Sequence, residues 1–383
     1  MLRRSLAILL VPALIAAPAT AELLAPPAEL APIPVALLVD VNSGRTLYSR
    51  EPDRRFLPAS TTKVMTAFVA FEEIAAGRLA SDRQFIVSDP TARQWNGRGT
   101  SMYLKAGDRV STDDLLHGIA TASANDASIV LAESYAGDVP RWCAMMNRAA
   151  AMLGMTGSRF ATPNGWPDQG ATYVTARDLV TLGEATITRH PQLYRTYFGQ
   201  KRMTWNGVEL ISHDPTVGVV RGADGIKTGH TNEAGYNFLG SAERDGRRLV
   251  MVVAGAKTEA DRASSSRALL EWGFAEWHDR PLFASGKAVA KAAVQAGDAR
   301  EVPLVTHRAI AATLARGETG PITLTVHYRG PLVAPIAKDA QVAELEIRAG
   351  DAPSSRLPLF AGQAVAKAGP LDRLVNGVMG WFS

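Results

Sequence analysis

A serine and a lysine lie three positions apart in the stretch from Leu57 to Ala67, where Ser60 and Lys63 begin an apolar run. Because residues three apart are neighbours on a helix surface, this spacing puts a hydroxyl beside an amine. A serine with a basic group beside it can act as a nucleophile. The pattern alone is weak, since a serine at a helix start is more often only the N-cap.

Two further short patterns lie downstream of this pair, Ser123-Ala124-Asn125 and Lys227-Thr228-Gly229. S-x-x-K, S-D-N and K-T-G occur together in penicillin-binding proteins and class A β-lactamases, and the middle pattern here reads S-A-N. The stretch from Lys227 to Asn237 closely resembles the same part of low-molecular-mass penicillin-binding proteins, the serine-type D-alanyl-D-alanine carboxypeptidases of the peptidase S11 kind. The resemblance runs from about Pro34 to Glu276, and more weakly to the C-terminus.

The resemblance implies a peptidase that works through an acyl-enzyme. Ser60 would attack the carbonyl of the penultimate D-alanine and release the terminal D-alanine, after which water hydrolyses the ester. A serine hydroxyl is a poor nucleophile at neutral pH, so its proton needs an acceptor, and Lys63 is the natural candidate. The positive end of the helix near Ser60 and a second ammonium, from Lys227, would both lower the pKa of Lys63.

The two downstream patterns are expected to surround the substrate. By the family pattern, Ser123 shuttles a proton and Asn125 holds a substrate amide. Lys227, Thr228 and Gly229 are expected on a strand at the edge of a sheet. There Lys227 and Thr228 would bind the substrate carboxylate, and Gly229 would let the substrate backbone approach.

The same resemblance implies an oxyanion hole made by the backbone N–H groups of Ser60 and His230. One part of the family pattern is missing. Where family members often carry an Asn-Arg-Asn stretch whose arginine helps to bind the terminal carboxylate, this chain reads Ser212-His213-Asp214-Pro215. His213 or Arg221 is a candidate substitute, and an ordinary solvated loop is the alternative for both.

The composition is that of a folded, exported protein. The 383 residues are 46% hydrophobic, which is enough apolar material for two domains or one large one. Met1 to Ala21 carries two arginines, an apolar run and an A-x-A ending, the pattern of a cleaved signal peptide, and residues 22–34 form a proline-rich leader. Cleavage takes the formal net charge from +4 to +2, because the segment holds two arginines and no acid. So small a charge argues against a nucleic-acid partner.

The chemistry-bearing residues outside these patterns predict neither a disulfide nor a cofactor. The single cysteine, Cys143, lies in an apolar helical run, so a buried structural role is expected. The seven histidines are scattered, without H-x-x-x-H spacing or a Cys/His cluster, so no metal is expected.

Alternating apolar runs predict a hairpin near each end of the catalytic region, in addition to one over Arg202–Trp205 and Val208–Ile211 around Asn206-Gly207. Of the two near the ends, one spans Val35–Val41 and Arg45–Ser49, and the other spans Tyr236–Ser241 and Leu249–Ala254, with a helix following from Thr258 to Trp277. The resemblance implies an α+β domain of the penicillin-binding, β-lactamase-like class. This domain has a five-stranded antiparallel sheet flanked by helices and a helical subdomain, with the active site between them.

The chain is expected to contain further units after a boundary near Arg280-Pro281. The catalytic domain is expected over residues 35–280, and short runs separated by glycines predict a small all-β domain over 281–369. Residues 370–383 place Leu371, Leu374 and Val375 on one face of an amphipathic helix, which would lie on a membrane surface. A terminal helix docked on its own protein is the alternative. The expected location is periplasmic, peripheral on the outer face of the cytoplasmic membrane.

The leading interpretation is a secreted carboxypeptidase that trims peptidoglycan pentapeptides and is acylated by β-lactam antibiotics. A DD-endopeptidase would use the same chemistry on cross-links. A class A β-lactamase is less well supported, because no Glu-x-x-Leu-Asn motif lies between the second and third patterns. A non-hydrolytic cell-wall scaffold protein is the alternative from a different class.

Overall fold

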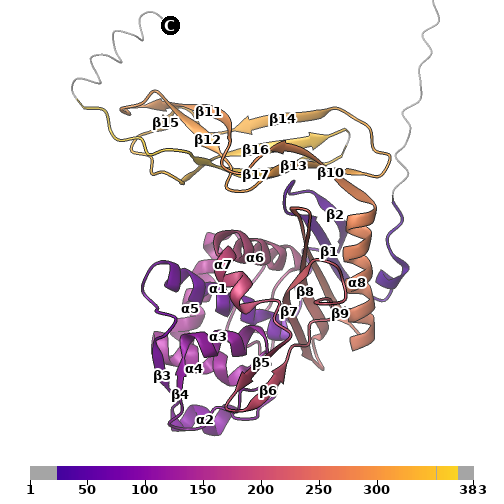
Figure 1. The fold of residues 1–383 in the computed structure, drawn as a ribbon, viewed down its shortest axis with the longest axis vertical. Coiled ribbons are helices and arrows are strands. Elements are labelled where there is room, and N and C mark those ends of the chain that lie inside the picture. Colours follow the sequence, from indigo (N-terminus) through magenta and orange to yellow (C-terminus); the bar gives the residue numbers. More distant parts are fainter. Residues whose placement is uncertain (1–23, 351, 370–383) are drawn as a thin grey trace, which may run out of the picture.

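The computed structural model describes residues 24–350 and 352–369, so the expected signal peptide and the expected C-terminal helix lie outside the described residues. A helical layer and a central sheet form one part of the molecule, and a second part made of β-strands sits across the end of that sheet (Figure 1). Within the described ranges, no helix is both long and apolar enough to cross a membrane.

The central sheet has five strands in the order β2-β1-β9-β8-β7, and every neighbouring pair is antiparallel. Its strands are β1 (Val35–Asp40), β2 (Thr46–Arg50), β7 (Ala223–Thr231), β8 (Gly235–Arg244) and β9 (Arg247–Ala256). Both hairpins predicted near the ends of the catalytic region are present, as β1 with β2 and as β8 with β9. Strand β7 lies at an edge of the sheet, so its outer side is open to a further strand.

Side chains alternate between the two faces of this sheet, and each face is buried against helices. Leu37 and Val252 belong to a large cluster shared with the helical layer. Leu38 and Met251 point the other way and pack against helix α8 (Glu259–Ala275). The predicted α+β class, with helices on both faces of an antiparallel sheet, is confirmed.

The helical layer also carries two small hairpins. Its helices are α1 (Lys63–Ala75), α2 (Asp89–Trp95), α3 (Thr112–Ala120), α4 (Asn125–Ala136), α5 (Val139–Met152), α6 (Ala176–Arg189) and α7 (Pro191–Tyr197). The hairpins pair β3 (Gln84–Ile86) with β4 (Arg109–Ser111) and β5 (Arg202–Trp205) with β6 (Val208–Ile211). Single 3₁₀ turns, η1 (Ala28–Leu30) and η2 (Ala59–Thr62), precede β1 and α1.

The second part of the chain is all-β, as predicted. Its strands are β10 (Trp277–Phe283), β11 (Ala288–Gln295), β12 (Glu301–Val305), β13 (Ile310–Ala315), β14 (Ile322–His327), β15 (Leu332–Val333), β16 (Gln341–Ala349) and β17 (Ser355–Ala361). Six of them form a sheet in the order β14-β16-β17-β12-β11-β15, and β10 pairs with β13. The boundary expected at Arg280-Pro281 falls inside β10.

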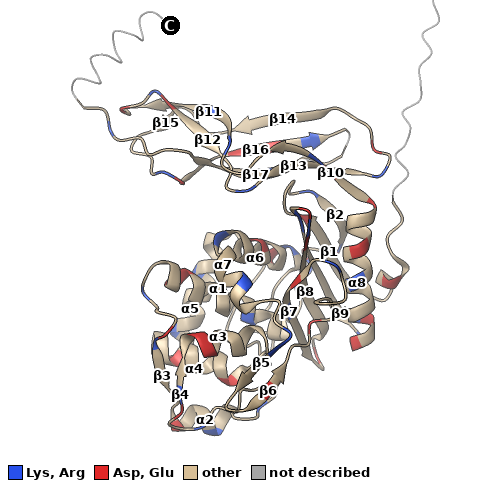
Figure 2. Cartoon of the chain, in the orientation of Figure 1, with Lys and Arg blue, Asp and Glu red and all other residues tan. Residues whose placement is uncertain are grey.

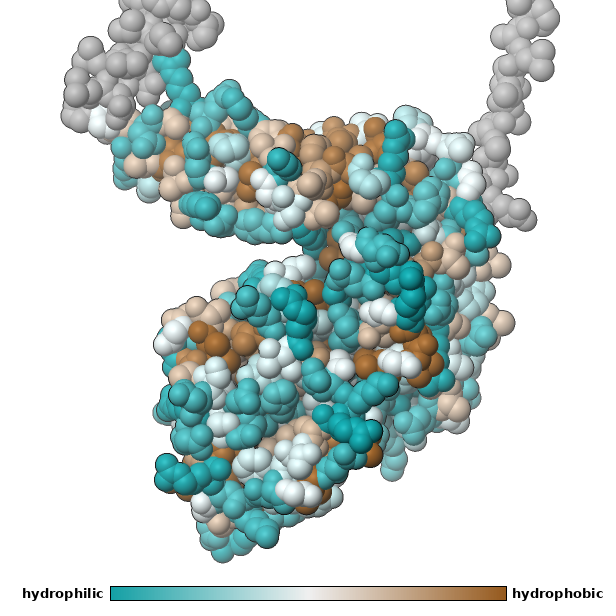
Figure 3. All heavy atoms as spheres, viewed as in Figure 1, coloured by the Kyte–Doolittle hydropathy of each residue, from teal (hydrophilic) through white to brown (hydrophobic). Residues whose placement is uncertain are grey.

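The turn between β1 and β2 connects the two parts through polar contacts. The Thr313 hydroxyl donates to Ser43 Oγ at 2.7 Å, and the Ser355 hydroxyl donates to the Ser43 carbonyl oxygen at 2.6 Å. Arg45 forms an ion pair with Glu318 at 2.9 Å. A deep indentation lies between the two parts (Figure 3), and Arg308 of the second part forms an ion pair with Glu184 on α6. Basic and acidic residues are interspersed over both parts (Figure 2), so this view shows no extended surface of one sign.

Candidate active site

Ser60 lies in η2, at the point where the chain turns into α1. Ala59, directly before it, has a φ of 49°, which is uncommon for a residue with a side chain. Lys63 is the first residue of α1 and is buried, with 1% of its surface exposed. Its Nζ lies 2.8 Å from Ser60 Oγ, 2.8 Å from Asn125 Oδ1 and 2.7 Å from the carbonyl oxygen of Asn164. The amine is therefore surrounded by three oxygen atoms.

The segment before Ser60 is held from two sides. The Asn237 side chain on β8 donates to the Leu57 carbonyl at 2.9 Å and accepts from the Gly255 N–H at 2.8 Å, which ties the segment to β8 and β9. On the other side, Gly165 packs against Ala59, where an added Cβ would lie 1.8 Å from the Ala59 carbonyl oxygen. Only a glycine fits at that position, and its φ of +72° also favours glycine.

The second pattern lies across the cleft, where α3 turns into α4. Ser123 has a φ of 60° in this turn, and Asn125 begins α4. The Asn125 amide donates to the Arg98 carbonyl oxygen at 3.0 Å, while its oxygen accepts from Lys63. The Thr100 hydroxyl donates to the Ser123 carbonyl oxygen at 2.6 Å. Each polar end of Asn125 therefore makes one bond within the protein and keeps the capacity for another on the cleft side.

A buried carboxylate fixes the loop that carries Thr100. Asp126 is 1% exposed and accepts hydrogen bonds from Ser101 Oγ at 2.7 Å, Met102 N at 3.0 Å and Leu104 N at 3.1 Å. A carboxylate with several N–H and O–H donors is a strong local anchor. The loop from Ser101 to Leu104 is thus fixed relative to the start of α4.

The third pattern lies on β7, at the edge of the sheet. Lys227 is 3% exposed, and its Nζ donates to the Thr228 carbonyl oxygen at 3.1 Å. An added Cβ on Gly229 would lie 2.5 Å from the Pro58 carbonyl oxygen and 3.0 Å from Ser60 N. The absence of a side chain at Gly229 thus lets β7 pack against the turn that carries Ser60. This differs from the expected reason for the glycine, which was access for the substrate backbone.

Burial lowers the pKa of both lysines, Lys63 and Lys227. Burial first, and then the charge of Lys227, hold the pKa of Lys63 well below its usual range. Burial and the charge of Arg262 lower the pKa of Lys227 to about 7. The expected influence of Lys227 on Lys63 is therefore present, but desolvation is the larger cause, and the charge of Asp126 acts in the opposite direction.

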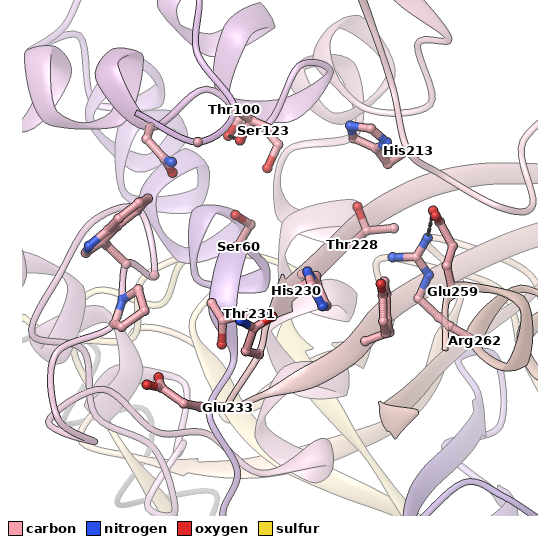
Figure 4. A pocket seen from close by; sticks show the side chains of 18 residues that line it. Ser60, Thr100, Ser123, His213, Thr228, His230, Thr231, Glu233, Glu259 and Arg262 are labelled. Carbon is pink, nitrogen blue, oxygen red and sulfur yellow. Dashed lines mark hydrogen bonds and ion pairs between the residues drawn. The ribbon is translucent and has the colours of Figure 1, made fainter. Parts of the chain in front are cut away.

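These residues surround a cleft of about 570 Å³ between the sheet and the helical layer (Figure 4). Among the residues singled out in the sequence, those that line it are Ser60, Ser123, Asn125, His213, Thr228, Gly229 and His230. Lys63 and Lys227 are buried beside it. In Figure 4, Ser60 is at the centre, with Thr228 and His230 on one side and Ser123 across from them. Thus the three patterns, distant in sequence, meet at one site.

Arg262 on α8 is a lining residue that sequence reasoning missed. Its side chain is 4% exposed, it forms an ion pair with Glu259 at 2.8 Å, and its Nε has no hydrogen-bond partner among the described residues. Arg221, one of the two expected substitutes, is wrongly assigned, because its side chain is 72% exposed, pairs with Asp245 and does not line the cleft. His213, the other one, does line it.

Both parts of the chain match models of known protein families. A family model described as D-alanyl-D-alanine carboxypeptidase, peptidase S11, matches residues 28–258. The chain belongs to the peptidase S11 family. A second model, the C-terminal domain of penicillin-binding protein 5, matches residues 277–367 of this S11 protein. The serine-type D-alanyl-D-alanine carboxypeptidase activity expected from the sequence is confirmed at the level of the family.

Curated relatives and solved structures are similar to this chain over most of its length. The D-alanyl-D-alanine carboxypeptidase DacD of Salmonella typhimurium is 35% identical over 347 residues, covering 88% of this chain and 87% of its own. The crystal structure of penicillin-binding protein 5 from Haemophilus influenzae has a TM-score of 0.71 and 29% identity, covering 88% of this chain and 98% of its own. Penicillin-binding protein D2 from Listeria monocytogenes in the ampicillin-bound form has a TM-score of 0.57 and 31% identity, covering 63% and 97%.

The structure also shows the environment of Cys143 and of the possible metal-ligating residues. Cys143 is buried in α5, and burial raises the pKa of its thiol to about 11, so it is a poor nucleophile at neutral pH. Within the described part of the chain, no group of three or more His, Cys, Asp or Glu residues is arranged to hold a metal ion.

Proposed function

We propose that Ser60 is the nucleophile that removes the terminal D-alanine from peptidoglycan stem peptides. The observation that carries the proposal is the 2.8 Å contact between Ser60 Oγ and Lys63 Nζ, made by a buried amine with a strongly lowered pKa. Attack of Oγ on the penultimate carbonyl forms the C–O bond, and collapse of the intermediate breaks the C–N bond to the terminal D-alanine. Water then hydrolyses the ester and regenerates Ser60.

Lys63 is the general base in this proposal. A neutral amine has two N–H donors and one lone pair, whereas an ammonium has three donors and no acceptor. Two neighbours of Nζ, Asn125 Oδ1 and the Asn164 carbonyl oxygen, can only accept hydrogen bonds. The lone pair of the neutral amine then faces Ser60 Oγ, so Lys63 can take the hydroxyl proton as the C–O bond forms.

The basic end of the cleft binds the substrate carboxylate in this proposal. Thr228 offers a hydroxyl, Lys227 a nearby ammonium, and Arg262 a guanidinium in the wall of the cleft. An arginine fits a carboxylate better than a point charge does, because its N–H groups are fixed in a plane. Arg262 therefore takes the role for which the sequence suggested His213 or Arg221.

Charge on the tetrahedral intermediate is stabilised by backbone donors in this proposal. The close packing of Gly229 on Ser60 N supports an oxyanion hole made by the N–H groups of Ser60 and His230. Each such donor typically contributes about 2.7–4 kcal/mol to lowering the barrier. Ser123, in the turn opposite, is the candidate to pass the proton from Lys63 to the leaving amine.

The direct test is release of D-alanine from a peptide that ends in D-Ala-D-Ala. The wild-type protein is expected to release it, and the Ser60→Ala variant is expected to release none. Ser134→Ala, on α4 and not among the cleft-lining residues, is the matched control and is expected to keep full activity. A wild-type protein that releases no D-alanine while remaining folded contradicts the proposal and favours the scaffold alternative.

The same site supports acylation of Ser60 by penicillins, and the similar penicillin-binding protein D2 from Listeria monocytogenes has a structure in an ampicillin-bound form. The N-terminal and C-terminal sequence patterns support export and attachment to the outer face of the cytoplasmic membrane. Flotation with anionic lipid vesicles tests the attachment, comparing the mature chain with one that ends at residue 369. Equal flotation of both chains argues against a role for the last residues.

A further inference from the structure

The cleft has two chemically different ends, with Ser60 between them. Arg262 and the buried Lys227 make one end basic. At the other end lie Thr231 and Glu233, and Figure 4 shows Arg262 to the right of Ser60 and Glu233 below it. A substrate that puts its carboxylate at the basic end therefore extends its preceding residues toward Glu233.

Strand β7 sets the direction in which a bound peptide runs. It passes from Lys227 at the basic end to Thr231 at the other, and its outer edge is open. A peptide with its C-terminus at Lys227 and its earlier residues toward Thr231 lies antiparallel to β7, the pairing that a sheet edge offers. With the penultimate carbonyl at the N–H of His230, the residue before it lies about 3.4 Å further on, beside Thr231, and its side chain can extend toward the turn that holds Glu233.

Glu233 is exposed and faces both the main cleft and a small side cleft that continues from it. Within the described residues its carboxylate forms no hydrogen bond or ion pair. The other acid of the side cleft, Asp168, accepts hydrogen bonds from the Thr172 N–H and hydroxyl with its two oxygens. Glu233 is therefore the carboxylate available to a cationic group of the substrate.

Trp166, which lines the same two clefts as Glu233, is firmly supported. It packs edge-to-face on Trp95, with ring centroids 5.6 Å apart. The Arg98 guanidinium lies 4.7 Å from the Trp166 ring centroid and 5.2 Å from that of Trp95. An aliphatic chain that ends in a cation suits such a site, since its methylenes contact the indole and its charge reaches the carboxylate.

We propose that Glu233 binds the side-chain ammonium of a diamino acid directly before D-Ala-D-Ala. Stem peptides are cross-linked through a side-chain amine, so uncross-linked peptides carry it free and cross-linked ones carry it as an amide. Glu233 then makes the enzyme prefer stem peptides whose amine is free. This inference deepens the proposed function and rests on it, because it uses the substrate direction that Ser60 and Arg262 define.

The test compares two peptides that differ only at that amine, Nα-acetyl-L-Lys-D-Ala-D-Ala and Nα,Nε-diacetyl-L-Lys-D-Ala-D-Ala. The wild-type protein is expected to favour the free amine in kcat/KM by about two- to fivefold at low salt, the range of an exposed ion pair. The preference is expected to fall in about 1 M salt, where the Debye length shortens to about 3 Å. Glu233→Gln is expected to lose the preference while keeping its activity on the diacetyl peptide.

Glu209→Gln is the matched control, because Glu209 is an acid on β6 that pairs with Arg202 and does not line the cleft. It is expected to keep the wild-type preference. Equal activity of the wild-type protein on both peptides, or a preference that survives in Glu233→Gln, overturns the inference and leaves the proposed function standing. A folded wild-type protein that cleaves neither peptide overturns the proposed function and the inference with it.

Discussion

Nζ of Lys63 lies 2.8 Å from Oδ1 of Asn125, so a side chain at the start of α1 is bonded to one at the start of α4. The contact joins the segment that carries Ser60 to the opposite wall of the cleft. It also fixes Nζ beside Ser60 Oγ, because Nζ is hydrogen-bonded to Asn125 Oδ1 and to Ser60 Oγ at the same time. The geometry of proton transfer is therefore built into the free protein.

Lys63→Arg tests whether this amine must lose its proton. An arginine stays charged at every usable pH and offers no lone pair, so it cannot accept the Ser60 proton. We expect the rate of acylation by benzylpenicillin to fall by about 10²- to 10⁴-fold, the usual contribution of a general base. Stopped-flow or mass-spectrometric acylation rates measure this, with the exposed Lys105→Arg as control. An acylation rate within threefold of the wild-type value argues against Lys63 as the base.

The pH dependence of kcat/KM follows from the two lysines. Lys63 must be neutral, so activity is expected to fall as acid protonates it below its lowered pKa. Lys227 must be charged to attract a carboxylate, so binding is expected to weaken above its pKa of about 7. The profile is therefore expected to be bell-shaped.

The alkaline limb of that profile can be assigned with one substitution. Lys227→Arg keeps its charge at high pH and is expected to remove the alkaline limb. His213→Gln is the control, because His213 lines the same cleft and burial lowers the pKa of its ring. If an active Lys227→Arg variant keeps the alkaline limb, the limb belongs to a group other than Lys227. The same holds if His213→Gln loses the limb.

Arg262→Gln and Arg221→Gln separate two arginines that differ in position. Arg262 lines the cleft with its guanidinium, so its loss is expected to raise KM for a D-Ala-D-Ala peptide by about 10- to 100-fold, as for a hydrogen bond to a charged group. Arg221 is exposed and paired with Asp245, so its loss is expected to leave KM unchanged. The reverse pattern would mean that the substrate carboxylate binds elsewhere.

Gly165→Ala and Gly170→Ala separate two effects of losing a glycine: displacement of the segment that carries Ser60, and backbone strain at a positive φ. Both glycines have positive φ, of +72° and +82°, but an added Cβ meets the Ala59 carbonyl oxygen at Gly165 and nothing within 4 Å at Gly170. Gly165→Ala is expected to displace Ser60 and lower kcat by about 100-fold, the effect of a shift of about 1 Å. Gly170→Ala is expected to cost stability only. Similar kcat values for the two variants, with both folded, contradict this view of Gly165.

Features that depend on neighbouring residues could be predicted from the sequence. The three-residue spacing of Ser60 and Lys63 is a local property of a helical turn, and their side chains meet as expected. The pairing of β8 with β9 follows from the Asp245-Gly246 turn and from alternating apolar residues. Both features, the Ser60–Lys63 contact and the β8–β9 hairpin, are determined by residues close to one another in the sequence.

Arg262 depends instead on the order of the strands. It reaches the third pattern only because α8 packs across the sheet, and proximity in sequence favoured Arg221, which points into solvent. A signal was present, since Arg262 shares the buried face of α8 with Ser265, Ser266 and Leu269. A charged residue on the buried face of a helix needs a partner or a function.

Mass spectrometry of the mature protein after incubation with benzylpenicillin tests the central claim most directly. We predict an increase by the mass of one penicillin, located on the peptide that contains Ser60, and no increase in Ser60→Ala. An adduct that persists in Ser60→Ala, or the absence of both adduct and drug hydrolysis in the folded wild-type protein, would contradict Ser60 as the nucleophile of an active enzyme. Rapid hydrolysis without an adduct would favour a β-lactamase.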